Sequence, residues 1–93
     1  MRLKGKSVMI VDHDCDRAGG TPAQQKACRD KRHVNVLKAG DGQYYYVNLD
    51  RPIARDIVLD PAQRGRRVVV DADYYPELRT VHLIRVEEAG PRL

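Results

Sequence analysis

Cys15 and Cys28, the two cysteines of the chain, are the residues whose type and spacing offer the most definite chemistry. A disulfide between them needs only that the end of a first strand lies close to the end of the helix that follows. Such a bond would stabilise the fold by roughly 3 kcal/mol, because it restricts the unfolded chain. The alternative is a pair of free thiols, which is the usual state of cysteines in a reducing compartment.

Two histidines lie near these cysteines in the sequence and add another possibility. Structural zinc is held in a tetrahedron of four ligands, most often cysteine sulfur and histidine nitrogen. Such a set is supplied by His13, Cys15, Cys28 and His33. Their spacing does not match a zinc finger, in which the ligands come in closely spaced pairs. We therefore predict a disulfide, with a metal site through these four residues as an alternative.

Three aspartates in the same segment, Asp12, Asp14 and Asp16, alternate as the acids do at the start of an EF-hand loop. Arg17 stands where such a loop needs glycine, and Ala23 stands where it needs a bidentate glutamate. We therefore interpret the segment as a polar loop and not as a calcium site.

Tyrosine is the only aromatic residue type in the chain, and its five copies fall in two short clusters. Aromatic side chains on a β-surface, with lysine or arginine beside them, can stack on bases while the cations contact phosphates. The possible ligand or nucleic-acid face is formed by Tyr44, Tyr46, Tyr74, Tyr75, Lys38, Arg66 and Arg67. The other interpretation is that the tyrosines cover the edge of a small core. A net charge of +4, spread among interleaved acids, permits nucleic-acid binding without requiring it.

Sequence signatures of catalysis are missing from the chain. It has no phosphate-binding glycine-rich loop and no dinucleotide fingerprint. His13, His33 and His82 are scattered, without a nucleophile or a pair of carboxylates at a suitable spacing. We therefore expect no enzymatic activity, no catalytic residues and no cofactor.

The elements that must position these residues are short and mostly extended. Four consecutive apolar residues, Val8 to Val11, are typical of a buried strand. A turn rich in glycine and aspartate at 39–42 lies between two apolar stretches and predicts a β-hairpin. Together with two later segments, which the turn at 74–79 separates, this gives five strands: 6–12, two within 33–49, 65–73 and 80–88.

Two short helices are predicted between the strands. Residues 21–30 begin with Thr21 and carry Gln24 three positions later, which is a capping-box pattern. For residues 50–61 we expect Asp50 to cap the helix. The i, i+4 spacing of Ile53 and Ile57 then predicts that both face the core.

This order of elements predicts the architecture, because a helix between the third and fourth of five strands is the arrangement of an OB barrel. Closing the sheet would also remove exposed strand edges. We predict a mainly β protein, a small five-stranded OB-like barrel with two short helices, and take an open α+β sheet as the alternative. The chain should form a single domain over 1–93, with an ordered core at about 5–88 and a frayed tail.

The string GKSVMIVDHDC, followed by KAC, GQYYYVNL and GRRVVVDAD, resembles small bacterial OB-fold-like domains of exported, periplasmic proteins. Those domains carry a cysteine after the first strand, a second cysteine after a polar loop, and repeated Gly and Val positions. The resemblance covers about 5–88 and is carried by Gly5, Asp12, Cys15, Cys28, Gly42, Tyr45, Leu49, Gly65, Val68 and Val70. Asp71 and Ala72 stand where a glycine often follows in the family. The function of that family is largely unassigned.

The resemblance implies a periplasmic or cell-envelope protein, although the first residues lack the features of a signal peptide. A cytoplasmic location is the alternative, and no run is long enough for a membrane span. We expect a non-enzymatic binding or accessory module, with a protein partner or a larger envelope complex. The alternatives are a single-stranded nucleic-acid-binding domain and a metal-binding domain through cysteine and histidine.

Overall fold

The computed structural model describes residues 1–19 and 21–89, and its strands form a closed barrel. Around the barrel the order is β1-β2-β3-β5-β4, and β4 pairs back with β1. Neighbouring strands are antiparallel, except that β3 and β5 run parallel. The strands are β1 (Arg2–Asp12), β2 (Asn35–Ala39), β3 (Tyr44–Val47), β4 (Arg67–Tyr75) and β5 (Thr80–Glu88). The predicted small OB-like barrel is confirmed, and the alternative of an open α+β sheet is wrong because the sheet closes on itself.

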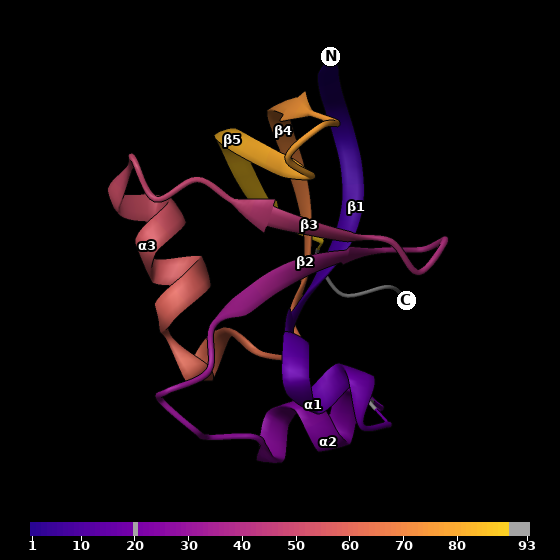
Figure 1. Ribbon diagram of the computed structural model, residues 1–93, viewed down its shortest axis with the longest axis vertical. Coiled ribbons are helices and arrows are strands. Elements are labelled where there is room, and N and C mark those ends of the chain that lie inside the picture. The colour runs from indigo at the N-terminus through magenta and orange to yellow at the C-terminus, as the bar shows by residue number, and fades with distance from the viewer. Residues whose placement is uncertain (20, 90–93) are drawn as a thin grey trace.

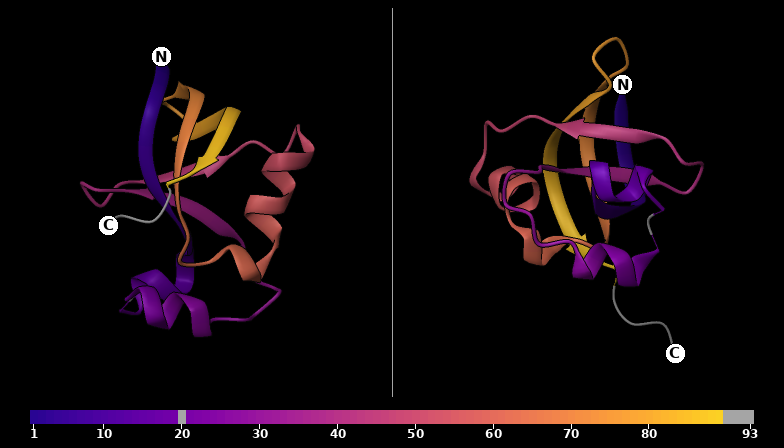
Figure 2. Two further views of the ribbon diagram at one scale, coloured as in Figure 1. Left: turned by 180° about the vertical axis from the view of Figure 1, so that it is seen from behind. Right: turned by 60° about the horizontal axis from the view of Figure 1, so that its bottom comes forward.

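The helices lie outside the barrel (Figure 1). They are α1 (His13–Arg17), α2 (Pro22–Ala27), α3 (Pro52–Leu59) and the short 3-10 helix η1 (Pro61–Gln63). At one end of the barrel α1 and α2 lie together, whereas α3 packs beside β2; the two views of Figure 2 show the same arrangement. Within the described residues, no helix has the length and apolar character needed to cross a membrane.

The predicted helices form, but with different bounds. In α2 the capping box of Thr21 and Gln24 is present, and the helix ends at Ala27. The prediction for the next helix was partly wrong: Asp50 does not cap α3, and its carboxylate lies 2.8 Å from His82 Nδ1 instead. Ile53 is exposed, because the helix turns Ala54, Ile57 and Val58 toward the barrel.

The first strand begins earlier than predicted and contains an irregularity at Gly5. Pairing with β4 shifts register between Leu3 and Lys6, and Gly5 adopts a positive φ of 61° there, a conformation that glycine favours. The Gly5 N–H donates a 2.7 Å hydrogen bond to Asp71 Oδ1 and lowers the pKa of that carboxyl. β1 runs from the N-terminus to the start of α1, at the other end of the barrel (Figure 1).

Aliphatic side chains fill the barrel, as expected for a chain without Phe or Trp. Inward-facing residues of all five strands contribute: Val8, Ile10, Leu37, Ala39, Tyr45, Val68, Val70, Ala72, Val81 and Leu83. Because side chains alternate along a strand, their sequence neighbours point outward. At the end of the described chain, the N–H of Ala89 donates to the carbonyl of Arg67. The fraying expected beyond it falls on 90–93, outside the described residues.

Candidate functional site

The two cysteines meet where α1 and α2 lie against each other. Cys15 is on α1 and Cys28 follows the last residue of α2. Their sulfur atoms are at bonding distance as a disulfide, and their Cα atoms are 6.7 Å apart. The cross-link therefore closes the long connection between β1 and β2.

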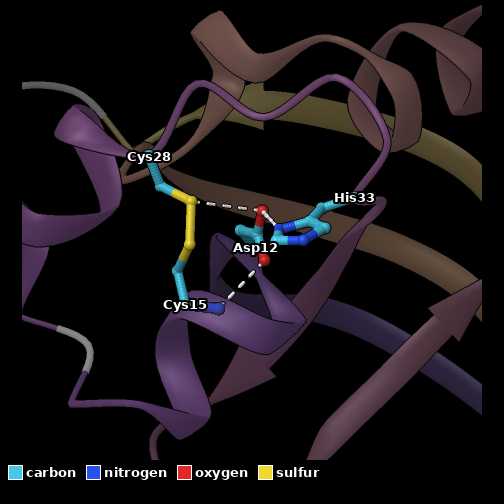
Figure 3. Close-up of side chains that lie close together, drawn as sticks. All are labelled: Asp12, Cys15, Cys28 and His33. Atoms are coloured by element: carbon cyan, nitrogen blue, oxygen red, sulfur yellow. Dashed lines mark hydrogen bonds and ion pairs between the residues drawn. A yellow bond between two sulfur atoms is a disulfide. The ribbon is translucent and has the colours of Figure 1, made fainter.

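Asp12 lies at the centre of this region and is fully buried at the end of β1 (Figure 3). Its Oδ1 accepts a 3.0 Å hydrogen bond from the N–H of Cys15, which caps α1. Its Oδ2 lies 2.9 Å from His33 Nδ1 and 3.3 Å from Cys28 Sγ. One carboxylate thus contacts both cysteine residues and a histidine.

The structure brings together three of the four residues predicted for a metal site. Ligand atoms of Asp12, Cys15, Cys28 and His33 all lie within 4.8 Å of one another, a group that we call the Asp12 cluster. His13 lies elsewhere, with its ring 4.7 Å from that of Tyr44. The reason is α1, which puts Asp12 and Cys15 on one side of its first turn and directs His13 to another. The D-x-x-C spacing after a strand was the signal for Asp12, a residue that sequence reasoning considered for calcium and for the resemblance but not beside the cysteines as a ligand.

Arg64 is the residue of this region that sequence reasoning missed. Its side chain is fully buried, and its Nη1 lies 3.2 Å from Asp12 Oδ2. It donates hydrogen bonds to Asn35 Oδ1 at 2.6 Å and to the carbonyl oxygens of Cys28, Asp30 and His33 at 2.8, 3.0 and 3.1 Å. A single guanidinium therefore holds the segment between α2 and β2 in place. No local pattern marks Arg64, because its partners lie far away in the sequence.

Further polar side chains complete the packing around Asp12. Gln25 accepts a 2.7 Å hydrogen bond from the Asp12 N–H, and Asn35 donates to the carbonyls of Ile57 and Asp60. Among residues 1–19 and 21–89, no buried side-chain nitrogen or oxygen lacks a hydrogen-bond partner. In this oxidised form the Asp12 cluster is therefore a satisfied structural centre.

Outside the barrel, strand register aligns part of the predicted ligand face. Tyr44 pairs with Lys38, Lys38 with Met9, and Met9 with Arg67, so these four form one row across β3, β2, β1 and β4. The buried Asp16 of α1 accepts hydrogen bonds from the Tyr44 hydroxyl and, at 2.9 Å, from Lys38 Nζ. The row therefore combines an aromatic ring with two cations.

The remaining predicted residues of the face separate. Tyr46 and Tyr75 are both exposed and lie in a second row, on either side of Thr80. Tyr74 was predicted for the face, but it packs edge-on against the core residue Tyr45, with ring centroids 5.0 Å apart. It faces inward because it alternates with Tyr75 along β4, which extends through a segment predicted as a turn.

A basic groove runs beside the first row. The groove consists of three adjoining hollows. The first, of about 360 Å³, and the second, of about 250 Å³, are both lined by Met9 and Arg67, and the second extends to Lys38. The first also shares Lys26 and Arg66 with a third of about 170 Å³. Besides the buried Arg64, which pairs with Asp12, the cations of the groove are Lys26, Arg29, Lys38, Arg66 and Arg67. Lys38 pairs with Asp16 and Arg66 with Glu88, whereas Lys26, Arg29 and Arg67 form no ion pair within the described part of the chain.

The Tyr44–Asp16 contact has a measurable consequence. Hydrogen bonding to Asp16 raises the pKa of Tyr44 to about 12, with burial adding to the effect. The pKa of tyrosine in the unfolded chain is near 10. The Tyr44–Asp16 hydrogen bond therefore contributes its full free energy to folding below about pH 10, and this contribution is lost as the pH rises through about 12. To test this, the phenolate absorbance of wild type and of Tyr44→Phe is titrated with pH and the second curve is subtracted from the first. We expect the difference to show a step near pH 12. A difference step near 10 would contradict the contact.

Comparison with protein-family models, with curated proteins and with solved structures finds no match in any of the three. The resemblance to exported domains therefore stays a prediction.

Proposed function

We propose that the protein is a non-enzymatic binding module of the cell envelope that receives an acidic partner protein along the basic groove. The observation that carries the proposal is the groove itself, in which Lys26, Arg29 and Arg67 have no acidic partner among the described residues. Unpaired cations along a concave surface attract an acidic ligand and raise its rate of association. Arg64, which lines one end of the groove, connects it to the Asp12 cluster through its ion pair with Asp12.

The cell envelope is proposed because of the Cys15–Cys28 disulfide, since disulfides persist in oxidising compartments and are rare in the cytosol. Alkylating free thiols in intact source cells before lysis, followed by intact-mass analysis, tests this part. We expect a chain without alkyl groups. A chain carrying two alkyl groups would contradict an oxidising location.

Binding of an acidic partner can be tested with labelled poly-glutamate as the probe, at several salt concentrations. We expect affinity that falls steeply with salt, because the attraction comes from exposed charges. Replacing Arg67 with glutamine should weaken binding, whereas Arg51→Gln, a matched change at the start of α3, should not. Equal affinities of the two variants, or no binding by wild type at low salt, would refute the proposal.

A single-stranded nucleic acid is the second candidate ligand, and exposed Tyr46, two positions after Tyr44 on β3, favours it. Stacking of a base on an aromatic ring contributes about 1–3 kcal/mol. If the ligand is nucleic acid, Tyr46→Ala should weaken oligothymidylate binding by about tenfold and leave poly-glutamate binding unchanged. Leu78→Ala removes another exposed apolar side chain and serves as the control. A flat oligothymidylate titration at low salt would exclude this candidate.

A further inference from the structure

We propose that reduction of the Cys15–Cys28 disulfide converts the Asp12 cluster into a zinc site, with Asp12, Cys15, Cys28 and His33 as the four ligands. The inference rests on the geometry of the cluster and does not depend on the partner proposed for the basic groove. In an oxidising environment the two cysteines of the cluster form a cross-link, and in a reducing one all four residues form a metal centre.

The ligand atoms lie close enough together to surround one zinc ion once the disulfide bond is broken. Zinc binds sulfur at about 2.3 Å and nitrogen or oxygen at about 2.0–2.2 Å, which places tetrahedral ligands roughly 3.3–3.8 Å apart. All four ligand atoms lie within 4.8 Å of one another. The Cα atoms of the cysteines, at 6.7 Å, are near the wide end of the range of about 4.4–6.8 Å for disulfides. The sulfur atoms can therefore separate around an ion without a large movement of the backbone.

The contact between Cys28 and Asp12 suits the reduced form better than the oxidised one. Cys28 Sγ lies 3.3 Å from Asp12 Oδ2, but a disulfide sulfur carries no hydrogen to donate. A thiol would donate a hydrogen bond across this distance, and a thiolate would share a cation with the carboxylate. Figure 3 shows the Asp12 carboxylate between the sulfur pair and the His33 ring.

The charges of the buried region remain balanced when the disulfide is replaced by zinc. A dithiol reductant becomes a disulfide and gives two electrons and two protons to the Cys15–Cys28 bond, which breaks into two thiols. Zinc then displaces the two thiol protons. Two thiolates and Zn²⁺ add no net charge, so the buried pair of Asp12 and Arg64, 3.2 Å apart, still compensates itself.

Residues around the cluster are placed as outer partners of a metal site. While Nδ1 of His33 faces Asp12, its Nε2 lies 3.5 Å from carboxylate oxygens of both Asp14 and Asp30. A metal-bound histidine commonly donates its second N–H to a carboxylate. Arg64 holds the carbonyls of Cys28 and His33, and so fixes the backbone of two ligands. The His33 side chain is 31% exposed, which leaves an approach for the ion.

The test is a zinc titration of the full chain, reduced with a phosphine, against a chromophoric chelator. We expect one tightly held ion per reduced chain and none in the oxidised protein. In the reduced chain His33→Gln should weaken zinc binding by more than about 100-fold, because loss of an outer partner alone costs about 10–100-fold and His33 is a ligand. His13→Gln is the matched control and should bind as wild type, because His13 lies with Tyr44 outside the cluster.

Cobalt added to the reduced wild-type protein gives a reading that needs no variant to fold. We expect a thiolate-to-cobalt charge-transfer band that vanishes on oxidation of the cysteines. Equal zinc binding by the reduced and oxidised protein, absence of the band, or loss of zinc in His13→Gln instead of His33→Gln would each overturn the proposal. Failure of poly-glutamate to bind would refute the proposed partner and leave the zinc result unaffected.

Discussion

Replacing Arg64 with methionine should lower the free energy of unfolding by about 3–5 kcal/mol, the usual cost of removing one partner of a buried ion pair. Methionine keeps most of the volume but leaves the Asp12 carboxylate without its cation. It also removes the donors to Asn35 and to three carbonyls of the segment before β2. Urea denaturation followed by circular dichroism at neutral pH measures the change.

Two further variants show whether the effect belongs to this site. Arg64→Lys keeps the positive charge but cannot reproduce the planar fork of hydrogen bonds, so it too should be less stable than wild type. Arg66→Met, two positions away, removes an ion pair with the exposed Glu88 and a hydrogen bond to Gln63, and should cost less than about 1 kcal/mol. If Arg64→Met were no more harmful than Arg66→Met, the guanidinium would not be the support of this segment.

Removal of the disulfide by the double change Cys15→Ser and Cys28→Ser should cost about 3 kcal/mol. The cysteines are 13 positions apart, and a closed loop of this size restricts the unfolded chain by that amount in chain-entropy terms. Equilibrium denaturation with a metal chelator present compares the oxidised wild type with the double variant. The chelator prevents traces of zinc from stabilising any wild-type chain whose cysteines are reduced.

Adding reductant supplies the matched control for this experiment. The oxidised wild type should lose stability toward the level of the double variant, whereas the double variant itself should not respond. If the free energy of unfolding fell by well below about 1 kcal/mol, the hydrogen bonds of Arg64 would be enough to hold the connection between β1 and β2 without the cross-link.

Features set by neighbouring residues could be predicted from the sequence. The alternation of Val68 and Val70 with more exposed residues marked β4, and the Thr21–Gln24 pair marked the start of α2. The order of these elements then led to the barrel, because a helix between the third and fourth of five strands is the arrangement of an OB barrel. The Cys15–Cys28 pair was predicted on the condition that the end of the first strand lies close to the end of the next helix, and the structure meets that condition.

Features that depend on distant parts of the chain could not be predicted. α1 is a single turn, too short for an apolar period, yet it decides that Asp12 and not His13 joins the cysteines. In the sequence Arg64 looks like any other surface cation. It is buried only because residues from 28–35 fold around it and accept its hydrogen bonds. The phase of α3, which exposes Ile53, depends on how the helix packs beside β2.

The way the barrel closes also governs how the chain acquires its structure. β1 pairs with β4, and β5 must lie between β3 and β4, so the last strand completes contacts with segments made much earlier. Such long-range pairing gives a high contact order, and domains of this kind fold in milliseconds to seconds. The barrel closes only once the chain has been made through Glu88, so a nascent chain should remain open to proteases and chaperones until β5 is present.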